Sequence, residues 1–230
     1  MRGVDVAAKN LSSKINNLFD QCRWEEARKI LEREREQDPQ SHWILTQLGV
    51  TFYEERRYGE ALKIFQESLI LLDDCPLTLW NLAGALDSLG KHNPAIKIYT
   101  WLLRSKESPE ENPCWENREW ADVLKADCVF RLGICFKNLG KKRPADHCFR
   151  QYANLLFTGI KGTYPIEDAR QEIENLHTSH SQATMQSELR KVVHSTLKQP
   201  EIEKQKGRIK SPPIFSERDL LPKLRAASKK

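Results

Sequence analysis

The amino-acid sequence predicts an all-α protein in which pairs of antiparallel helices stack into a solenoid. The main observation is an internal repeat, because Ala95 lies 34 residues after Ala61 and the same shift aligns apolar and small residues around both. The other aligned pairs are Leu45 with Leu79, Gly49 with Ala83, Phe52 with Leu86, and Phe65 with Tyr99. Within each copy, apolar residues also recur at helical spacing. Such a repeat is expected to bury its apolar face by stacking on its neighbours.

We expect four copies of this repeat along the chain. They lie at about residues 8–41, 42–75, 76–104 and 126–156. Each copy consists of a first helix, a short turn and a second helix. The small residues Gly49 and Ala83 are expected where a first helix crosses its partner closely, since a larger side chain would hold the two backbones apart. Gly90 suits the left-handed end of a helix.

The fourth copy is displaced by an insert at 105–125. We expect a short loop there, followed by a lengthened first helix that starts at about Trp115, with Trp115 and Trp120 as packing anchors. Residues 157–198 contain two amphipathic segments, which are expected to be helices that cap the open end of the solenoid. Residues 199–230 are rich in Lys, Glu, Pro, Ser and Arg, and this composition predicts a flexible tail.

Charge and composition limit the classes of protein to which this chain can belong. The net charge is +5, but the chain from Gln186 onward carries twelve Lys or Arg against five acids, so the basicity belongs to the tail. No apolar run approaches the roughly 20 residues that cross a bilayer, and the first residues do not resemble a signal peptide. The six cysteines form no Cys-x-x-Cys pair, which favours reduced thiols. We expect a cytoplasmic protein with no membrane partner.

The sequence contains few residue patterns that are typical of catalytic, phosphate-binding or metal-binding sites. The pair Gly159 and Gly162 lacks the other features of a phosphate-binding loop. Two groups of side chains could be imagined as metal ligands: His147 and Cys148 with Cys128 and Cys135, and His177 with His180. The first group lacks the short spacing of structural zinc pairs, and buried cysteine is a common core residue. The second has only two members. We expect no enzymatic activity, no metal and no cofactor.

The period of 34 residues, with a small residue eight places into the first helix and an Ala early in the second, resembles the tetratricopeptide repeat (TPR) family. The resemblance covers about residues 8–156 and is weakest in the first copy, where Ile15 stands at a position that the family gives to Gly or Ala. It implies helix pairs stacked into a right-handed superhelix whose first helices line a concave groove. Proteins of this family generally hold a peptide or helix of a partner protein in that groove.

Carried over by position, the resemblance places twelve residues in the groove. They are Trp43, Thr46, Val50, Tyr53, Leu77, Trp80, Gly84, Asp87, Asp127, Phe130, Ile134 and Lys137. The predicted partner-binding residues are Trp43, Val50, Tyr53, Leu77, Trp80, Asp127, Phe130 and Ile134. Most of these are apolar or aromatic, and exposed patches of that kind usually mark binding surfaces where aromatic anchors supply much of the energy.

One branch of the family grips the C-terminal carboxylate of Hsp70 and Hsp90 chaperones with Lys, Asn and Arg. The two possible frames for this clamp read Ser12, Asn16, Gln47, Leu77 and Asn81, or Thr46, Val50, Asn81, Asp127 and Arg131. Leu77 in one frame and Asp127 in the other stand where a cation should meet the carboxylate. We therefore expect no such clamp.

Three functional hypotheses follow. The leading one is an adaptor or chaperone-like module that holds an apolar segment of a partner protein in the groove. The second is a structural subunit of a larger assembly, with the groove filled by the protein's own C-terminal segment. The third is a nucleic-acid-associated regulator acting through the basic tail, which is disfavoured because Phe215 is the only aromatic residue available for base stacking there. Residues 209–215 could instead form a short linear motif held by another protein or by this groove.

Overall fold

The computed structural model of the 230-residue chain describes residues 2–106 and 112–197. The described residues form helices and no strand. In order, the helices are α1 (Arg2–Asp20), α2 (Trp24–Gln37), α3 (His42–Glu54), α4 (Tyr58–Leu71), α5 (Pro76–Ser88), α6 (His92–Arg104), the 3-10 turn η1 (Pro113–Trp115), α7 (Arg118–Asn138), α8 (Lys142–Phe157) and α9 (Ile166–Leu197). The predicted tail at 199–230 and the segment 209–215 lie outside the described residues.

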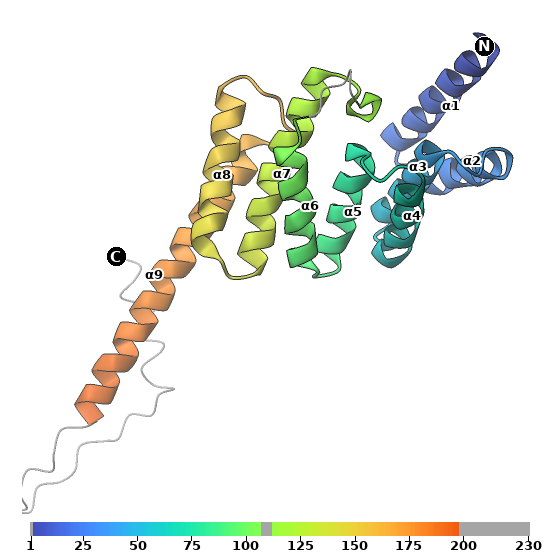
Figure 1. The fold of residues 1–230 in the computed structure, drawn as a ribbon. Helices are drawn as coiled ribbons and strands as arrows, with labels where there is room; N and C mark the ends of the chain where they lie inside the picture. The colour runs from blue at the N-terminus through green and yellow to red at the C-terminus, as the bar shows by residue number, and fades with distance from the viewer. Residues whose placement is uncertain (1, 107–111, 198–230) are drawn as a thin grey trace, which may run out of the picture. The chain divides into compact units, whose positions relative to one another are not determined.

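Contacts divide the chain into two units, Met1–Thr184 and Met185–Lys230. In the first unit, each α-helix from α1 to α7 packs on the next α-helix along the chain, and α5 also contacts α3 and α7. Figure 1 shows the hairpins α5–α6 and α7–α8 as neighbouring antiparallel pairs. The predicted helical-hairpin solenoid is therefore confirmed, with the first helices α3, α5 and α7 lying in succession beside one another.

The four hairpin turns share one backbone geometry. At each turn one residue has a positive φ, between 54° and 73°, and the next backbone N–H donates to a carbonyl five residues earlier at 2.8 or 2.9 Å. The positive-φ residues are Cys22, Arg56, Gly90 and Gly140. This is the left-handed helix ending that satisfies carbonyls left free by the last turn. Each first helix therefore reverses into its partner in the same way.

Close helix crossings explain the small residues of the repeat. A Cβ added at Gly49 would lie 2.4 Å from Cε1 of Phe65, and one added at Gly133 would lie 2.6 Å from Cε1 of Phe149. In both hairpins an aromatic ring on the second helix fills the space that a side chain on the first helix would need. The predicted role of Gly49 is confirmed.

The divergent first hairpin differs from the second in having a larger residue on its first helix and a smaller one on its second helix. Ile15 occupies the position of Gly49, and Leu31 occupies the position of Phe65. Both side chains are fully buried in one cluster with Leu18 and Ala27. A larger residue on the first helix is thus matched by a smaller one on the second, which keeps the packed volume similar.

The insert before α7 contains the 3-10 turn η1 and the first residues of α7. α7 begins at Arg118 rather than at Trp115, because Asn117 caps it by accepting a hydrogen bond from the Trp120 backbone N–H at 2.9 Å. With 21 residues, α7 is longer than the 13-residue α3 and α5, as predicted. Trp115 lies in η1 and is fully buried in the largest core cluster.

α9 is one continuous helix from Ile166 to Leu197, whereas the sequence predicted two. No Gly or Pro interrupts this range, so no residue in it favours a break. Ala169 and Leu176 are buried in the largest core cluster, which also contains residues of α7 and α8, and this agrees with a capping role for this part of α9. In the described part of the chain, no helix combines the length and apolar character needed to cross a membrane.

Candidate functional site

A hollow of about 130 Å³ lies where α5 and α7 carry the predicted groove residues. Its lining residues are Leu77, Trp80, Trp120, Val123, Leu124, Asp127 and Thr163. Leu77 and Trp80 come from the first turns of α5, and the extended N-terminal part of α7 supplies Trp120 and Val123. The insert that displaces the fourth repeat therefore builds one wall of the hollow. Sequence reasoning missed this role, because Trp120 was interpreted as a packing anchor.

Trp80 is half-buried, with its ring packed against the largest core cluster. Its indole Nε1 is buried and has no hydrogen-bond acceptor among the described residues. A buried donor without an acceptor costs about 1 to 3 kcal/mol. The ring therefore contributes apolar surface here and no hydrogen bond.

The α3 part of the predicted groove is half-buried. Trp43 packs against the cluster of the first hairpin, and Val50 and Tyr53 pack against the cluster shared by α4 and α5. Each of the three keeps part of its surface exposed. On α7, Ile134 has the same intermediate exposure and packs against the largest cluster.

Arg131 on α7 crosses toward α3 and α6. Its Nη2 donates to the Tyr53 hydroxyl at 2.9 Å, and its Nε donates to the Tyr99 hydroxyl at 3.3 Å. A Cβ added at Gly84 would lie 3.3 Å from Nη2, so the absence of a side chain on Gly84 leaves room for the guanidinium. Among the described residues, no carboxylate forms an ion pair with Arg131.

The segment between α8 and α9 covers the C-terminal end of the predicted groove. Asp127 accepts hydrogen bonds from the Thr163 backbone N–H at 2.9 Å and from the Thr163 hydroxyl at 2.5 Å. Phe130 is only 5% exposed, and its ring stacks on Tyr164 with centroids 4.3 Å apart. The protein's own chain therefore occupies this end, through the segment before α9 rather than through a C-terminal helix.

Burial dominates the electrostatics of this covered end. It raises the pKa of the Asp127 carboxyl, while the hydrogen bonds from Thr163 act in the opposite direction. Burial also raises the pKa of Tyr164 to about 12, so the phenol is neutral at physiological pH. The Tyr152 hydroxyl links the segment to α8, because it donates to the Tyr164 carbonyl at 2.6 Å and accepts from the Tyr164 N–H at 3.1 Å.

We expect Asp127→Ala to loosen this segment and to lower the free energy of unfolding by about 1 to 3 kcal/mol, because both Thr163 donors lose their acceptor. The measurement is native-state hydrogen exchange, in which the Thr163 amide should exchange faster. Asp122→Ala is the matched control, since Asp122 lies on the same helix and is exposed. Equal exchange of the Thr163 amide in both variants would contradict the role given to Asp127.

Other positions carried over from the resemblance lie inside the protein or in ion pairs. The buried Thr46 hydroxyl contacts the hydroxyls of Ser68 at 2.9 Å and Thr78 at 2.6 Å. Buried hydroxyls require hydrogen-bond partners, and these contacts connect α3, α4 and α5. Thr46 and Asp87 are both buried, so the expectation that they lie on the groove surface is wrong. Lys137 forms an ion pair with Glu172 of α9 at 2.7 Å.

Comparison with known proteins gives matches among solved structures. A crystal structure of MamA aligns with a TM-score of 0.53 and 14% identity over 75% of this chain and 82% of that chain. A MamA chain from residue 41 onward, from Desulfovibrio magneticus RS-1, aligns with a TM-score of 0.50 and 12% identity over 76% and 96% of the two chains. The Sgt2 TPR domain from Aspergillus fumigatus gives 0.45 and 15% over 73% and 90%. No family model and no curated protein matches the sequence.

Three observations identify the fold. They are the stacked hairpins, the crossings at which a glycine meets an aromatic ring, and the spacing of 34 residues. The fold is that of the tetratricopeptide repeats. At identities this low, the likeness to MamA establishes the architecture of the chain and nothing about its partners. Within this TPR fold, α3, α5 and α7 are the first helices of the second to fourth repeats.

Proposed function

We propose that this TPR protein is an interaction module that holds an apolar peptide or helix of a partner protein against α3, α5 and α7. The observation that carries the proposal is the hollow between α5 and α7, in which Leu77 and Trp80 face Val123 and Trp120. A concave apolar site with aromatic walls is the usual place for an anchoring side chain of a partner. The half-buried Trp43, Val50 and Tyr53 would extend the contact along α3.

The polarity of the hollow favours an apolar ligand. Its two polar lining residues, Asp127 and Thr163, already satisfy each other through two hydrogen bonds. The remaining lining side chains offer mainly carbon surface and carry no charge, so a charged partner group would lose water without gaining a counter-charge. A leucine, methionine or phenylalanine side chain of the partner would meet these conditions.

Replacing both Leu77 and Trp80 by Ala should abolish capture of the partner in a pull-down at about 0.5 M salt, where contacts between exposed charges are screened. Trp80→Phe should retain most of the binding, because it keeps an aromatic wall and removes only the indole N–H that lacks an acceptor. The matched control is Trp101→Ala, since Trp101 is 44% exposed and outside this hollow.

Thermal melting of each variant separates loss of binding from loss of folding. A partner that still binds the folded double variant, or that is lost equally with Trp101→Ala, would contradict the proposed surface. Because the proposal depends on apolar contact, capture that disappears between low salt and about 0.5 M salt would also contradict it.

A second candidate is a structural subunit whose groove is permanently closed by its own chain. The contacts of Thr163 and Tyr164 with Asp127 and Phe130 favour it at the C-terminal end of the groove. The Asp127→Ala variant distinguishes the two functions. If the segment competes with a partner, loosening it should increase partner binding, whereas a permanent closure should leave binding elsewhere unchanged or weaken the assembly.

A further inference from the structure

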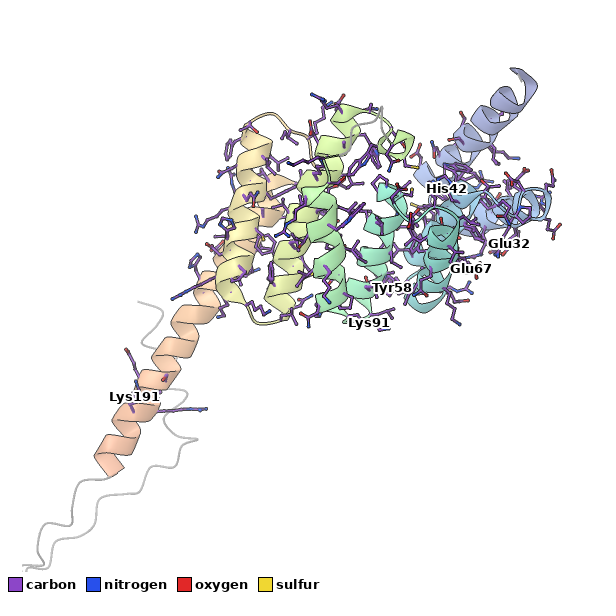
Figure 2. All side chains as sticks on the ribbon, viewed as in Figure 1. Glu32, His42, Tyr58, Glu67, Lys91 and Lys191 are labelled. Atoms are coloured by element: carbon purple, nitrogen blue, oxygen red, sulfur yellow. The ribbon has the colours of Figure 1, made fainter. Side chains whose placement is uncertain are left out.

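Three potential metal ligands meet where the insert returns to the second and third repeats. His42 is the first residue of α3, Cys75 immediately precedes α5, and Cys114 lies in η1. One ring nitrogen of His42 and the two Sγ atoms all lie within 4.8 Å of one another. Figure 2 labels His42 at the beginning of α3.

We propose that His42, Cys75 and Cys114 form a binding site for a thiophilic divalent cation, with zinc as the expected ion. This differs from the expectation from sequence, which considered other cysteines and predicted no metal. The three ligands are far apart in the chain and show no short Cys-x-x-Cys or His-x-His spacing. Only the packing of η1 against α5 brings them together.

The distances suit tetrahedral coordination. With Zn–S bonds of about 2.3 Å and Zn–N bonds of about 2.1 Å, the S···N edge of a tetrahedron is about 3.6 Å and the S···S edge about 3.8 Å. The Sγ of Cys114 lies 3.5 Å from Nε2 of His42. The third ligand atom is within 4.8 Å of both, so small side-chain rotations complete this face of the coordination sphere.

The position of Cys75 favours a thiolate, which is the form that binds metal. Cys75 is the N-cap residue of α5, where the helix dipole stabilises negative charge. Two thiolates side by side require a cation to offset their charge, and the Sγ atoms of Cys75 and Cys114 meet His42 at one point where such a cation would lie.

The insert is held against the chain immediately before Cys75. Asn112 of the insert donates to the Asp74 backbone carbonyl at 3.4 Å, which fixes the position of η1 beside the start of α5. Asp74 is not among the side chains whose ligand atoms lie within 4.8 Å of one another, so we assign the fourth coordination position to water.

A second cluster, made by Asp87, His92 and Cys135, has a different character. Asp87 Oδ1 lies 2.7 Å from His92 Nδ1 and accepts from the Cys135 thiol at 3.2 Å. These groups satisfy one another as hydrogen-bond partners and include only one thiol. These mutual hydrogen bonds explain why the polar groups are buried between α5, α6 and α7. The proposal is therefore confined to the first cluster.

The test uses the reduced full-length protein, freed of metal by a chelator and titrated with Co²⁺ and then Zn²⁺. We expect a single equivalent of Co²⁺ to produce the thiolate-to-cobalt charge-transfer band and the intense visible bands of tetrahedral cobalt, which Zn²⁺ should abolish. Cys114→Ser and His42→Asn should each weaken cobalt binding by at least about 100-fold, because each removes a direct ligand. Cys148→Ser is the matched control, since Cys148 is buried but belongs to neither cluster.

Thermal melting supplies a second readout that does not depend on cobalt spectra. Zn²⁺ should raise the Tm of the wild-type protein and of Cys148→Ser, because binding to the folded state alone stabilises it. It should leave the Tm of Cys114→Ser unchanged. Cobalt spectra that persist in Cys114→Ser, or that are lost equally in Cys148→Ser, would overturn the proposal. Absence of metal binding together with formation of a Cys75–Cys114 disulfide on mild oxidation would overturn it in favour of a redox pair.

Discussion

Replacing Trp115 by Ala is expected to lower the free energy of unfolding by about 3 to 5 kcal/mol, the range found for large aromatic residues removed from a core. The indole is fully buried in the cluster that joins α5 to α9. Its ring centroid lies 6.2 Å from that of Trp120, and Nζ of Lys125 lies 5.0 Å from its centroid. Removal of the ring leaves a large cavity between the insert and the last repeats. Urea denaturation followed by circular dichroism measures the effect.

Trp101→Ala is the control for this prediction. Trp101 is 44% exposed on α6, so its truncation leaves no closed cavity and should cost about 1 kcal/mol or less. Similar losses of stability in the two variants would show that Trp115 is not the anchor of the insert. A loss confined to Trp115→Ala would show that the insert is an integral part of the folded core.

Gly49→Leu is expected to destabilise the second hairpin by about 1 to 3 kcal/mol, because overpacking forces backbones or rings out of place. The closest obstacle is the Phe65 ring, with Cε1 only 2.4 Å from the position of an added Cβ. Phe65 is fully buried, so it has no free space to move into. The midpoint of chemical denaturation should fall accordingly.

The first hairpin suggests a second substitution that should restore part of the lost stability. Because it pairs Ile15 with Leu31, the double variant Gly49→Ile/Phe65→Leu should recover part of the stability lost in Gly49→Ile alone. Gly59→Ala is the control, since nothing lies within 4 Å of an added Cβ there, and it should stabilise α4 by up to about 1 kcal/mol. Additive losses in the double variant would contradict the exchange of volumes between the two helices.

The predicted repeats could be found because their physical cause is periodic. The second and fourth hairpins place a glycine against a phenylalanine ring at the same separation, so one alignment of Ala61 with Ala95 predicts helices, turns and crossings together. The groove positions on α5 and α7 followed from the same register. Leu77 and Trp80 line a hollow, although their binding to a partner stays a prediction.

The sequence by itself therefore determined the features that depend on residues at a repeated spacing, namely the all-α class and the stacked hairpins. Tertiary structure alone decided the features made by residues that do not repeat. Thr163 and Tyr164 cover Asp127 and Phe130 only because the chain after α8 turns back onto α7. Likewise His42, Cys75 and Cys114 meet only because η1 packs beside α5. Contacts of this kind arise from packing between distant segments, and no periodicity in the sequence records them.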